Sequence, residues 1–429
     1  MRHLEIRIIT DEANFDSLNQ EWNTLAWASN TYIFQTFEWN RTWWEHFGTT
    51  DKLYLILFYS ENRLIGIAPF FKDTYQIIGK TVYSALRLIG SVVSQPKGEV
   101  LIGLSSYSDY LDIIVEPAFE ENVAQALVDF LKKKNLQKDE IIFDEAHEKS
   151  FVINHFLPVL IESGLVFEIE KCSTCTTISL TDSWDSYLSK LSKNSRKKNR
   201  KYLNEIEEKK PDGFNLNGIH DSDELLVAFD ELVKLHQKQW NHRGFPGTFY
   251  EKRMYEFTSD ICSQFYKNGW LMIEKLTSID NRNDTINAEM FFTYKKRMYS
   301  VHGGTDTDSP HLHRGVGNIT FTKVLKQAIE NGFETFDYLR GDEDYKVSRA
   351  DHIYSNMRII IQNAGPLKSI WIYIIKLKIN IFRRARVEII QFMLSFRNRK
   401  LIEGFRAYQN FISNRITAKR KSKPLIISG

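Results

Sequence analysis

Apolar and polar positions in the first 165 residues alternate in ways that predict a series of strands and helices. Two apolar runs in LYLILFYSENRLIGIAPFF (53–71) flank the polar SEN, which predicts a strand hairpin. Another strand is predicted over 109–117, and apolar residues spaced by three or four predict a helix over 118–135. A short buried strand, DEIIFDEA (139–146), then precedes a helical segment that ends at Gly164.

The second half repeats much of this order after three predicted helices. Two strands joined at KKR are predicted within 285–306, followed by a helix over 318–332 and the strand FETFDYL (333–339). The three preceding helices are predicted within 186–213, 223–240 and 249–269, and the first of them ends at a Pro-Asp-Gly breaker.

Strand–helix–strand blocks with hairpins attached favour a mixed, mostly antiparallel α/β sheet in each half. The segments IIFDEA (141–146) and TFDYLR (335–340) occupy matching places in the two halves, which indicates a duplication. We therefore expect two domains, 1–165 and 166–365, followed by a tail over 366–429.

The tail differs from the rest of the chain in charge. Residues 366–429 hold 15 Lys/Arg and two acidic residues, so the tail has a net charge of +13. The whole chain has a net charge of +3, so the rest of the chain has a net charge of −10. From Ile370 to Phe396 apolar residues recur every three or four positions with basic residues between them, which predicts a basic amphipathic helix or a pair of them. Two interpretations stay open: the helix packs on the acidic body, or it forms a peripheral foot on anionic membrane.

Composition narrows the class of protein. The chain has 429 residues, 42% of them hydrophobic, so it can bury sizeable cores. Its three cysteines argue against a disulfide framework, and the C-x-x-C pair Cys172/Cys175 has no second pair to complete a zinc site. The N-terminus lacks an apolar signal core, and no uncharged apolar run approaches the roughly 20 residues that cross a bilayer. We expect a cytoplasmic protein without a metal, peripheral to the inner face of the membrane if the tail binds lipid.

Glycines cluster in the loop HGGTDTDSPHLHRGVGNITF (302–321), between a predicted strand and the helix that follows. Glycines at a strand-to-helix turn let backbone N–H groups approach a phosphate, and the helix N-terminus adds its dipole. The loop matches neither G-x-G-x-x-G nor a Walker motif, and a flexible loop in which Gly317 eases helix entry is the alternative. The predicted cofactor-binding residues are Arg314, Gly315, Val316, Gly317 and Asn318.

The ordered segments GWLMIEKL, INAEMFFTYKKRMYSVHGGTD, GVGNITF and ENGFETFDYLRGDEDYK resemble a known enzyme group. This is the acetyltransferase group related to cellulose-biosynthesis acetyltransferases, within the GNAT superfamily of acyl-CoA N-acyltransferases. Upstream, FQTFEWNRTWWEHFG, LIGIAPFF, SDYLDIIVEP and LSKNSRKKNRKYL are similar to the same group, so the resemblance covers roughly residues 20–362. It implies two GNAT-like domains in tandem, with the acyl-donor site in the second.

One position departs from the superfamily pattern. The pyrophosphate loop reads Arg/Gln-x-x-Gly-x-Gly/Ala, and LHRGVG supplies Gly315 and Gly317 but has Leu312 where Arg or Gln is expected. The resemblance implies acetyl-CoA, or another acyl-CoA, as the donor, while this departure leaves the donor's identity open. The architecture is also similar to Fem-type transferases, which use aminoacyl-tRNA to build peptidoglycan cross-bridges.

Acyl transfer to an amine or hydroxyl needs a base for the acceptor's proton and donors for the thioester oxygen. His302 and Asp306, beside the glycine loop, are placed for the base, with Glu289 on the neighbouring strand in reserve. No Ser-His-Asp or Cys-His arrangement stands out, so we expect direct transfer without a covalent enzyme intermediate.

The segment LRGDEDYK (339–346) matches the Arg-Gly-Asp-Glu-x-Tyr-Lys segment of the resembling group. Tyr345 could protonate the departing thiolate, and Lys346 could hold a phosphate or substrate anion. Arg340 and Asp342 could instead pair and fix the loop. The predicted catalytic residues are Asp306, His302, Asp337, Tyr345 and Lys346, and the predicted substrate-binding residues are Arg340, Asp342 and Glu289.

The sequence therefore predicts an acyl-CoA-dependent N- or O-acetyltransferase that acts on a sugar or polysaccharide precursor of the bacterial envelope. A Fem-type aminoacyl-tRNA-dependent transferase and a non-catalytic envelope-assembly factor are the alternatives. The seven basic residues within 190–201 form either a solvated helix face or a surface for an anionic substrate or RNA, and we expect no DNA partner.

Overall fold

The computed structural model describes residues 4–48, 52–93, 107–133, 139–208, 212–219, 221–279, 284–362 and 366–396. They divide into two compact units. The first contains the chain up to Thr174 together with Tyr354–Glu388, and the second contains Cys175–Ile353 and the stretch that begins at Ile389. The predicted division at residues 165 and 365 stays a prediction about sequence halves. In the structure the last strand before residue 365 belongs to the first unit, as described below.

The first unit is a mixed sheet with strand order β1-β2-β3-β4-β6-β13. Neighbouring strands are antiparallel except β4 and β6, which are parallel. The predicted hairpin is present as β2 and β3, and its turn places Glu61 and Asn62 in the left-handed region. The strands are β1 (Glu5–Ile9), β2 (Leu53–Ser60), β3 (Arg63–Ile77), β4 (Lys80–Leu88), β6 (Glu140–His147) and β13 (His352–Gln362), and the short β5 (Ile114–Val115) pairs with β3.

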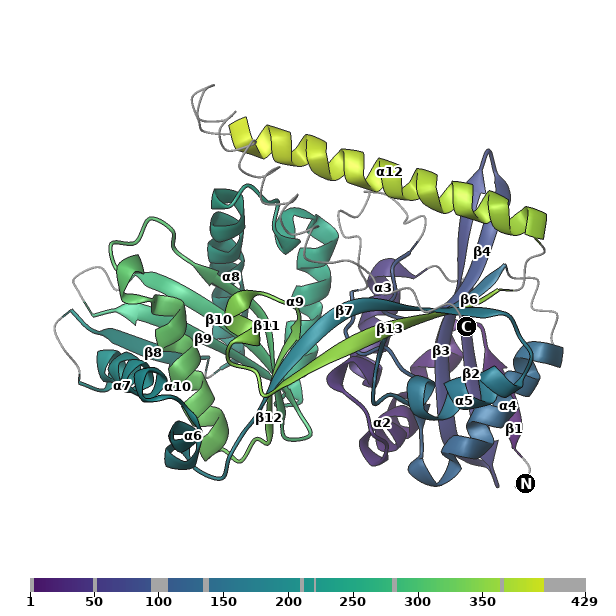
Figure 1. Cartoon of the computed structure of the whole chain (residues 1–429), viewed down its shortest axis with the longest axis horizontal. Coiled ribbons are helices and arrows are strands. Elements are labelled where there is room, and N and C mark those ends of the chain that lie inside the picture. The colour runs from purple at the N-terminus through teal and green to yellow at the C-terminus, as the bar shows by residue number, and fades with distance from the viewer. Residues whose placement is uncertain are drawn as a thin grey trace. The chain divides into compact units, whose positions relative to one another are not determined.

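Helices cover this sheet because their apolar residues recur on one face. Val123 and Leu127 of α4 pack with Ile141 and Phe143 of β6 in one core, and α5 joins the same layer (Figure 1). The predicted helix over 118–135 is thus present as α4, whose described residues end at Lys133. The helices of the unit are α1 (Glu12–Asp16), α2 (Asn19–Ala28), α3 (Phe37–Phe47), α4 (Glu120–Lys133) and α5 (Leu157–Glu162).

The second unit repeats the arrangement with strand order β7-β12-β11-β10-β9-β8. Here the parallel neighbours are β11 and β12. The predicted strands over 285–306 and 333–339 are present as β10, β11 and β12. The strands are β7 (Phe167–Ser179), β8 (Phe214–Gly218), β9 (Leu271–Ser278), β10 (Thr285–Tyr294), β11 (Arg297–Thr305) and β12 (Thr335–Arg340).

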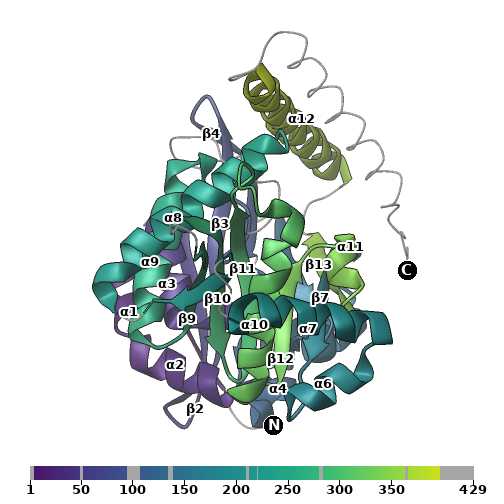
Figure 2. The same cartoon turned by 90° about the vertical axis from the view of Figure 1, so that its left-hand side faces the viewer.

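Opposite faces of this second sheet carry different helices (Figure 2). Met290 and Phe292 of β10 face α9, while Phe291 faces α10, because side chains alternate along a strand. Helix α8 lies on the α9 face, where a Cβ atom at Gly304 of β11 would meet its backbone. The helices are α6 (Trp184–Lys190), α7 (Lys193–Glu207), α8 (Ser222–His242), α9 (Lys252–Lys267), α10 (Val316–Glu330) and α11 (Asp344–Val347).

The last strand of the second half completes the sheet of the first unit. This strand, β13, pairs with β6, from Asn356–His147 to Gln362–Glu140. The second unit begins with the end of β7, which pairs with β12, with Ser179 opposite Thr335. The first unit therefore contains a strand from a distant part of the sequence.

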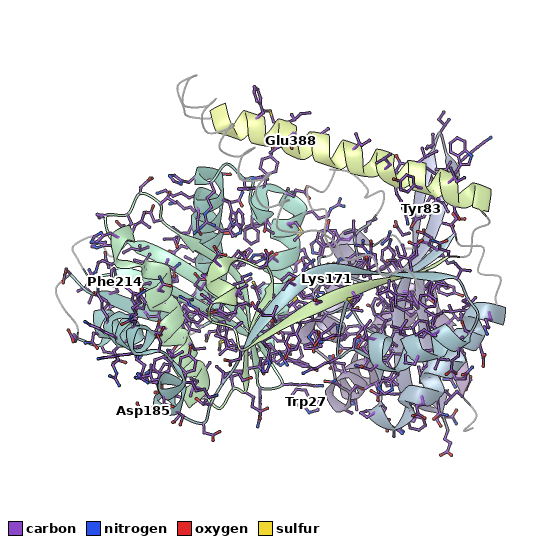
Figure 3. All side chains as sticks on the ribbon, in the orientation of Figure 1. Trp27, Tyr83, Lys171, Asp185, Phe214 and Glu388 are labelled. Atoms are coloured by element: carbon purple, nitrogen blue, oxygen red, sulfur yellow. The ribbon has the colours of Figure 1, made fainter. Side chains whose placement is uncertain are left out.

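After β13 the chain forms α12 (Pro366–Phe396), so the predicted basic amphipathic segment is a single helix over its described residues. Ile372 and Ile375 of α12 are buried in a cluster with Tyr83 and Ile142 of the first unit (Figure 3). None of the helices among the described residues combines the length and apolar character needed to cross a bilayer. Residues 397–429, the rest of the predicted tail, lie outside the described residues.

Candidate functional site

Strands β11 and β12 separate in the middle of the second unit. Their parallel pairing extends over three positions, from Arg297–Thr335 to Tyr299–Asp337, and both strands continue beyond it. A bulge in the pairing of β10 with β11 follows Phe291–Ser300. Val301, His302 and Gly303 are only partly buried, so backbone groups of β11 are accessible at the separation. The separation creates a place where a ligand can lie against a strand edge.

The glycine loop ends at the N-terminus of α10. Gly315 adopts the left-handed conformation, with φ 76°, and forms the N-cap, where no side chain caps the helix. The first turn contains no acidic residue, and a Cβ atom added to Gly317 would meet nothing within 4 Å. The first N–H groups and the positive end of the helix dipole therefore face open space, as a phosphate site requires.

The other residues predicted to bind the cofactor have partners within the fold. The Arg314 guanidinium bonds to Glu205 of α7 and lies 4.4 Å from the ring centroid of Phe214, labelled in Figure 3. Asn318 accepts a hydrogen bond from Arg349, and Val316 is buried in a hydrophobic cluster. Their contacts make these three residues supports of the loop, and the two glycines shape its surface.

Two glutamates lie side by side on the sheet face that α10 covers. Glu289 of β10 pairs with Glu274 of β9, and the glycines Gly218 and Gly303 complete the row on either side. A Cβ atom at Gly303 would lie 2.1 Å from Oε2 of Glu289, and one at Gly218 would lie 3.2 Å from Oε1 of Glu274. The glycines therefore leave the space that the two carboxyl groups occupy.

Burial changes the acidity of both carboxyl groups. It raises the pKa of Glu289 to about 7, although a 3.1 Å hydrogen bond from Asn287 Nδ2 acts in the opposite direction. Burial also raises the pKa of Glu274 to about 7, against the charge of Lys323. Glu289 is still partly accessible to solvent. A carboxylate that is half-ionised near neutral pH and can be reached from outside is suited to accept a proton.

The two residues ranked first as base are less suited. Burial lowers the pKa of His302 to about 3, and its ring packs 5.6 Å from His236 and 4.9 Å from Phe249, on the face opposite Glu289. Partial burial acts to raise the pKa of Asp306, but the hydrogen bond from Lys238 of α8 outweighs it, so the pKa is lowered. The geometry thus favours Glu289, the reserve candidate, over both.

The loop after β12 is fixed by its own charged groups. Asp337 accepts hydrogen bonds from Arg297 and from the backbone N–H of Leu339, at 3.2 and 2.8 Å, and Leu339 has φ 58°. The Lys346 ammonium donates to the carbonyl of Arg340 at 2.8 Å and pairs with Glu343 at 3.1 Å.

Gly341 is required in this loop for two reasons. Its φ is 135°, and a Cβ atom there would lie 2.5 Å from Nζ of Lys346. Lys346 is therefore engaged in the loop itself, while Asp342 is exposed and Arg340 is half-buried beside the turn.

Tyr345 of this loop packs edge-on against Tyr338, with ring centroids 6.2 Å apart. The residue is 52% exposed, and burial, together with the charges of Glu343 and Glu289, raises its pKa to about 12. At neutral pH Tyr345 keeps its proton and can donate a hydrogen bond.

The basic segment around α7 borders the glycine loop. The Tyr202 hydroxyl would lie 3.6 Å from a Cβ atom at Gly315, and Asn199 bonds to Thr322 of α10. The exposed basic residues of the segment are Lys193, Lys197, Lys198, Arg200 and Lys201.

Sequence reasoning missed Glu274 and Lys238. Glu274 had a signal, a single acid inside the apolar run LMIEKL, whereas Lys238 lies on a helix that the sequence does not place near the loop. Among the described residues no group of three or more His, Cys, Asp or Glu could hold a metal ion.

Residues 190–347 match the acetyltransferase (GNAT) domain family. They extend from the end of α6 through α11 and include the separated strands and the uncapped helix. This part of the second unit is therefore similar to a GNAT acetyltransferase domain. The protein is therefore an acyltransferase, and its GNAT domain implies a donor of the acyl-CoA type. No protein of curated function matches the chain in sequence.

Solved structures that match the chain have low sequence identity to it. The structure named FemX is 14% identical, has a TM-score of 0.54, and the match covers 82% of this chain and 98% of that one. A tandem GNAT protein from the clavulanic acid biosynthesis pathway is 8% identical, with a TM-score of 0.43 over 85% of this chain and 100% of that one. The FemX likeness supports the predicted mixed α/β fold.

Proposed function

We propose that the protein transfers an acetyl group from acetyl-CoA directly to an acceptor, with Glu289 as the general base. The observation that carries this proposal is the position of Glu289, opposite Gly303 in the part of β11 that continues beyond its pairing with β12. The pyrophosphate of the donor would lie on the N–H groups of Val316 and Gly317, at the open end of α10.

The reaction follows from these positions. Glu289 accepts a proton from the acceptor's amine or hydroxyl group as that group attacks the thioester carbonyl carbon. Accessible N–H groups of β11 near Val301 and Gly303 would stabilise the charge on the carbonyl oxygen. The carbon–sulfur bond then breaks, and the CoA thiolate leaves with a hydrogen bond from Tyr345 and takes up a proton. Asp337 and Lys346 act as positioning residues, since their bonds hold the loop that carries Tyr345.

The acceptor class rests on the resemblance of the ordered sequence segments. We propose a sugar or polysaccharide precursor of the bacterial envelope, as an N- or O-acetyl acceptor. The acyltransferase domain disfavours the non-catalytic assembly factor. The Fem-type alternative is favoured by one observation, the exposed basic residues of α7 beside the donor loop, which could bind the phosphates of a tRNA as well as those of CoA.

Thermal unfolding with each donor tests the proposal. Acetyl-CoA at 100 times its Kd should stabilise the protein by about 2.7 kcal/mol through mass action. An increase in Tm with acetyl-CoA, together with CoA species that co-purify and are detected by mass spectrometry, supports it. No change in Tm with acetyl-CoA and an increase with aminoacyl-tRNA would replace it with the Fem-type activity.

A further inference from the structure

Helix α12 has apolar residues on two opposite sides. One side docks on the first unit, where Ile372 and Ile375 are 3% and 6% exposed and pack with Tyr83 and Ile142. On the same side Lys376 pairs with Glu140 at 2.6 Å. Docking on the body therefore accounts for one face of the helix.

The other side carries an apolar stripe that nothing among the described residues covers. At 100° per residue, Ile370, Ile374, Leu377 and Ile381 fall within about 60° of one another, on the side away from Ile372. These four residues are between 47% and 58% exposed. These four residues, Ile370, Ile374, Leu377 and Ile381, are called the exposed stripe of α12.

We propose that the exposed stripe binds the surface of an anionic membrane. Residues 366–396 contain six basic residues and one acidic residue, Glu388, so an anionic surface attracts the helix. Trp371 and Tyr373 border the exposed stripe and are 66% and 68% exposed, and these side chains favour the boundary between apolar and aqueous phases. An apolar face bordered by basic and aromatic residues is typical of helices that lie in the plane of an interface.

Charge also argues against the two occupants that this chain could supply. A second copy of α12 would bring a helix of net charge +5 against another of net charge +5. Residues 397–429 hold nine basic residues and one acidic residue, so they carry +8 and would also be repelled. An anionic lipid surface satisfies both the apolar stripe and the positive charge. This inference does not depend on the proposed reaction.

Vesicle flotation of the full-length protein tests the inference. The protein should float with phosphatidylcholine vesicles that contain phosphatidylglycerol, much less with phosphatidylcholine alone, and less at high salt. The double variant Ile374→Glu, Leu377→Glu should weaken binding at least about tenfold because it removes apolar burial and adds negative charge. The control Ile161→Glu changes a residue of α5 that is 60% exposed and should float like the wild type.

Two results would overturn the inference. One is wild-type protein that stays with the pellet fraction at low salt in the presence of phosphatidylglycerol. The other is a wild-type dimer, seen by sedimentation, that the double variant loses while flotation is unchanged. The acetyl-CoA-induced increase in Tm should be the same in the variant and the wild type, which separates loss of membrane binding from loss of fold.

Discussion

The two units share a skeleton, but they use the corresponding places differently. In each, two parallel strands pair over three positions and then a helix crosses between them: β4, α4 and β6 in the first unit, β11, α10 and β12 in the second. Helix α10 begins with glycine and has no acid in its first turn, whereas α4 begins with Glu120 and Glu121. Acidic side chains already complement the dipole of α4, so an anionic ligand would be repelled there.

The parallel strands of the two units also differ in the charged residues at their ends. In the first unit Arg87 of β4 is bound to Asp73 and Asp144, at 2.9 and 2.8 Å, and Arg358 also bonds to Asp144. Both aspartates are fully buried, so this ion network is part of the core. In the second unit the corresponding aspartate, Asp337, pairs with Arg297, and β11 beyond this pair is partly accessible. We infer that the ion network of the first unit occupies the position that corresponds to the candidate site of the second unit.

Exchanging Glu289 for Gln should produce the largest effect, since it removes the base from the second unit. We expect acetyl transfer, measured as release of free thiol, to fall about 10²- to 10⁴-fold. The wild-type rate should rise with pH through about 7, as the carboxyl group loses its proton, and the variant should lack that inflection. The Tm increase with acetyl-CoA should persist. A variant that keeps the wild-type rate and pH profile would remove Glu289 from the mechanism.

Breaking the ion network should affect the first unit alone. Arg87→Met leaves two buried aspartates without one of their partners, and such losses cost about 3–5 kcal/mol of unfolding free energy. Chemical denaturation measures this loss. The acetyl-CoA affinity of the folded protein should stay unchanged, because the donor loop belongs to the second unit. A large loss of affinity without a loss of stability would contradict the separation of roles.

Gly317→Glu should make α10 resemble α4 by placing an acid in its first turn. Since a side chain there meets open space, the fold should tolerate it, while the carboxylate repels the donor's phosphates. We expect acetyl-CoA affinity, measured by calorimetry, to fall by at least about tenfold, which corresponds to 1.4 kcal/mol. Gly317→Ala is the matched control and should lose less. Equal affinities for both variants and the wild type would mean that the donor lies elsewhere.

At pH 8 Glu289→Gln should also be more stable than the wild type. The pKa of this carboxyl group is raised in the folded state, so the wild type loses stability as pH rises from about 4.3, the unfolded value, to about 7. Because Gln does not ionise, the variant does not lose this stability as the pH rises. Melting curves at pH 5 and pH 8 should show an advantage of a few degrees at pH 8 and little at pH 5. A lower Tm at pH 8 would show that the ionised group is stabilised in the fold.

Asp306→Asn should have the smallest effect, less than about tenfold on transfer, because the pKa of Asp306 is already lowered by Lys238. The sequence alone led to the opposite expectation. A loss as large as that of Glu289→Gln would restore Asp306 as the base.

The sequence identifies local features of the site well. Alternation predicts β10 and β11, helical spacing predicts α10, and the glycines predict the turn between them. The ranking of Glu289 over Asp306 needs information that spacing does not contain. It depends on the pairing of β10 with β11, which places Glu289 opposite Gly303. It also depends on the hydrogen bond to Asp306 from Lys238 of α8, which lies 68 positions away in the sequence. Burial and cross-strand pairing determine acidity, and both arise only in the assembled sheet.

The contribution of β13 to the first unit affects how the chain is synthesised and folded. During synthesis β6 leaves the ribosome with one edge open, and its partner β13 follows after some 200 further residues, on the order of ten seconds later at about 5–20 residues per second. Throughout that interval an apolar strand edge is free to pair with other nascent chains. A gene fragment that ends at residue 165 would lack β13 and would keep this edge open, so we expect the fragment to associate through it when it is expressed by itself.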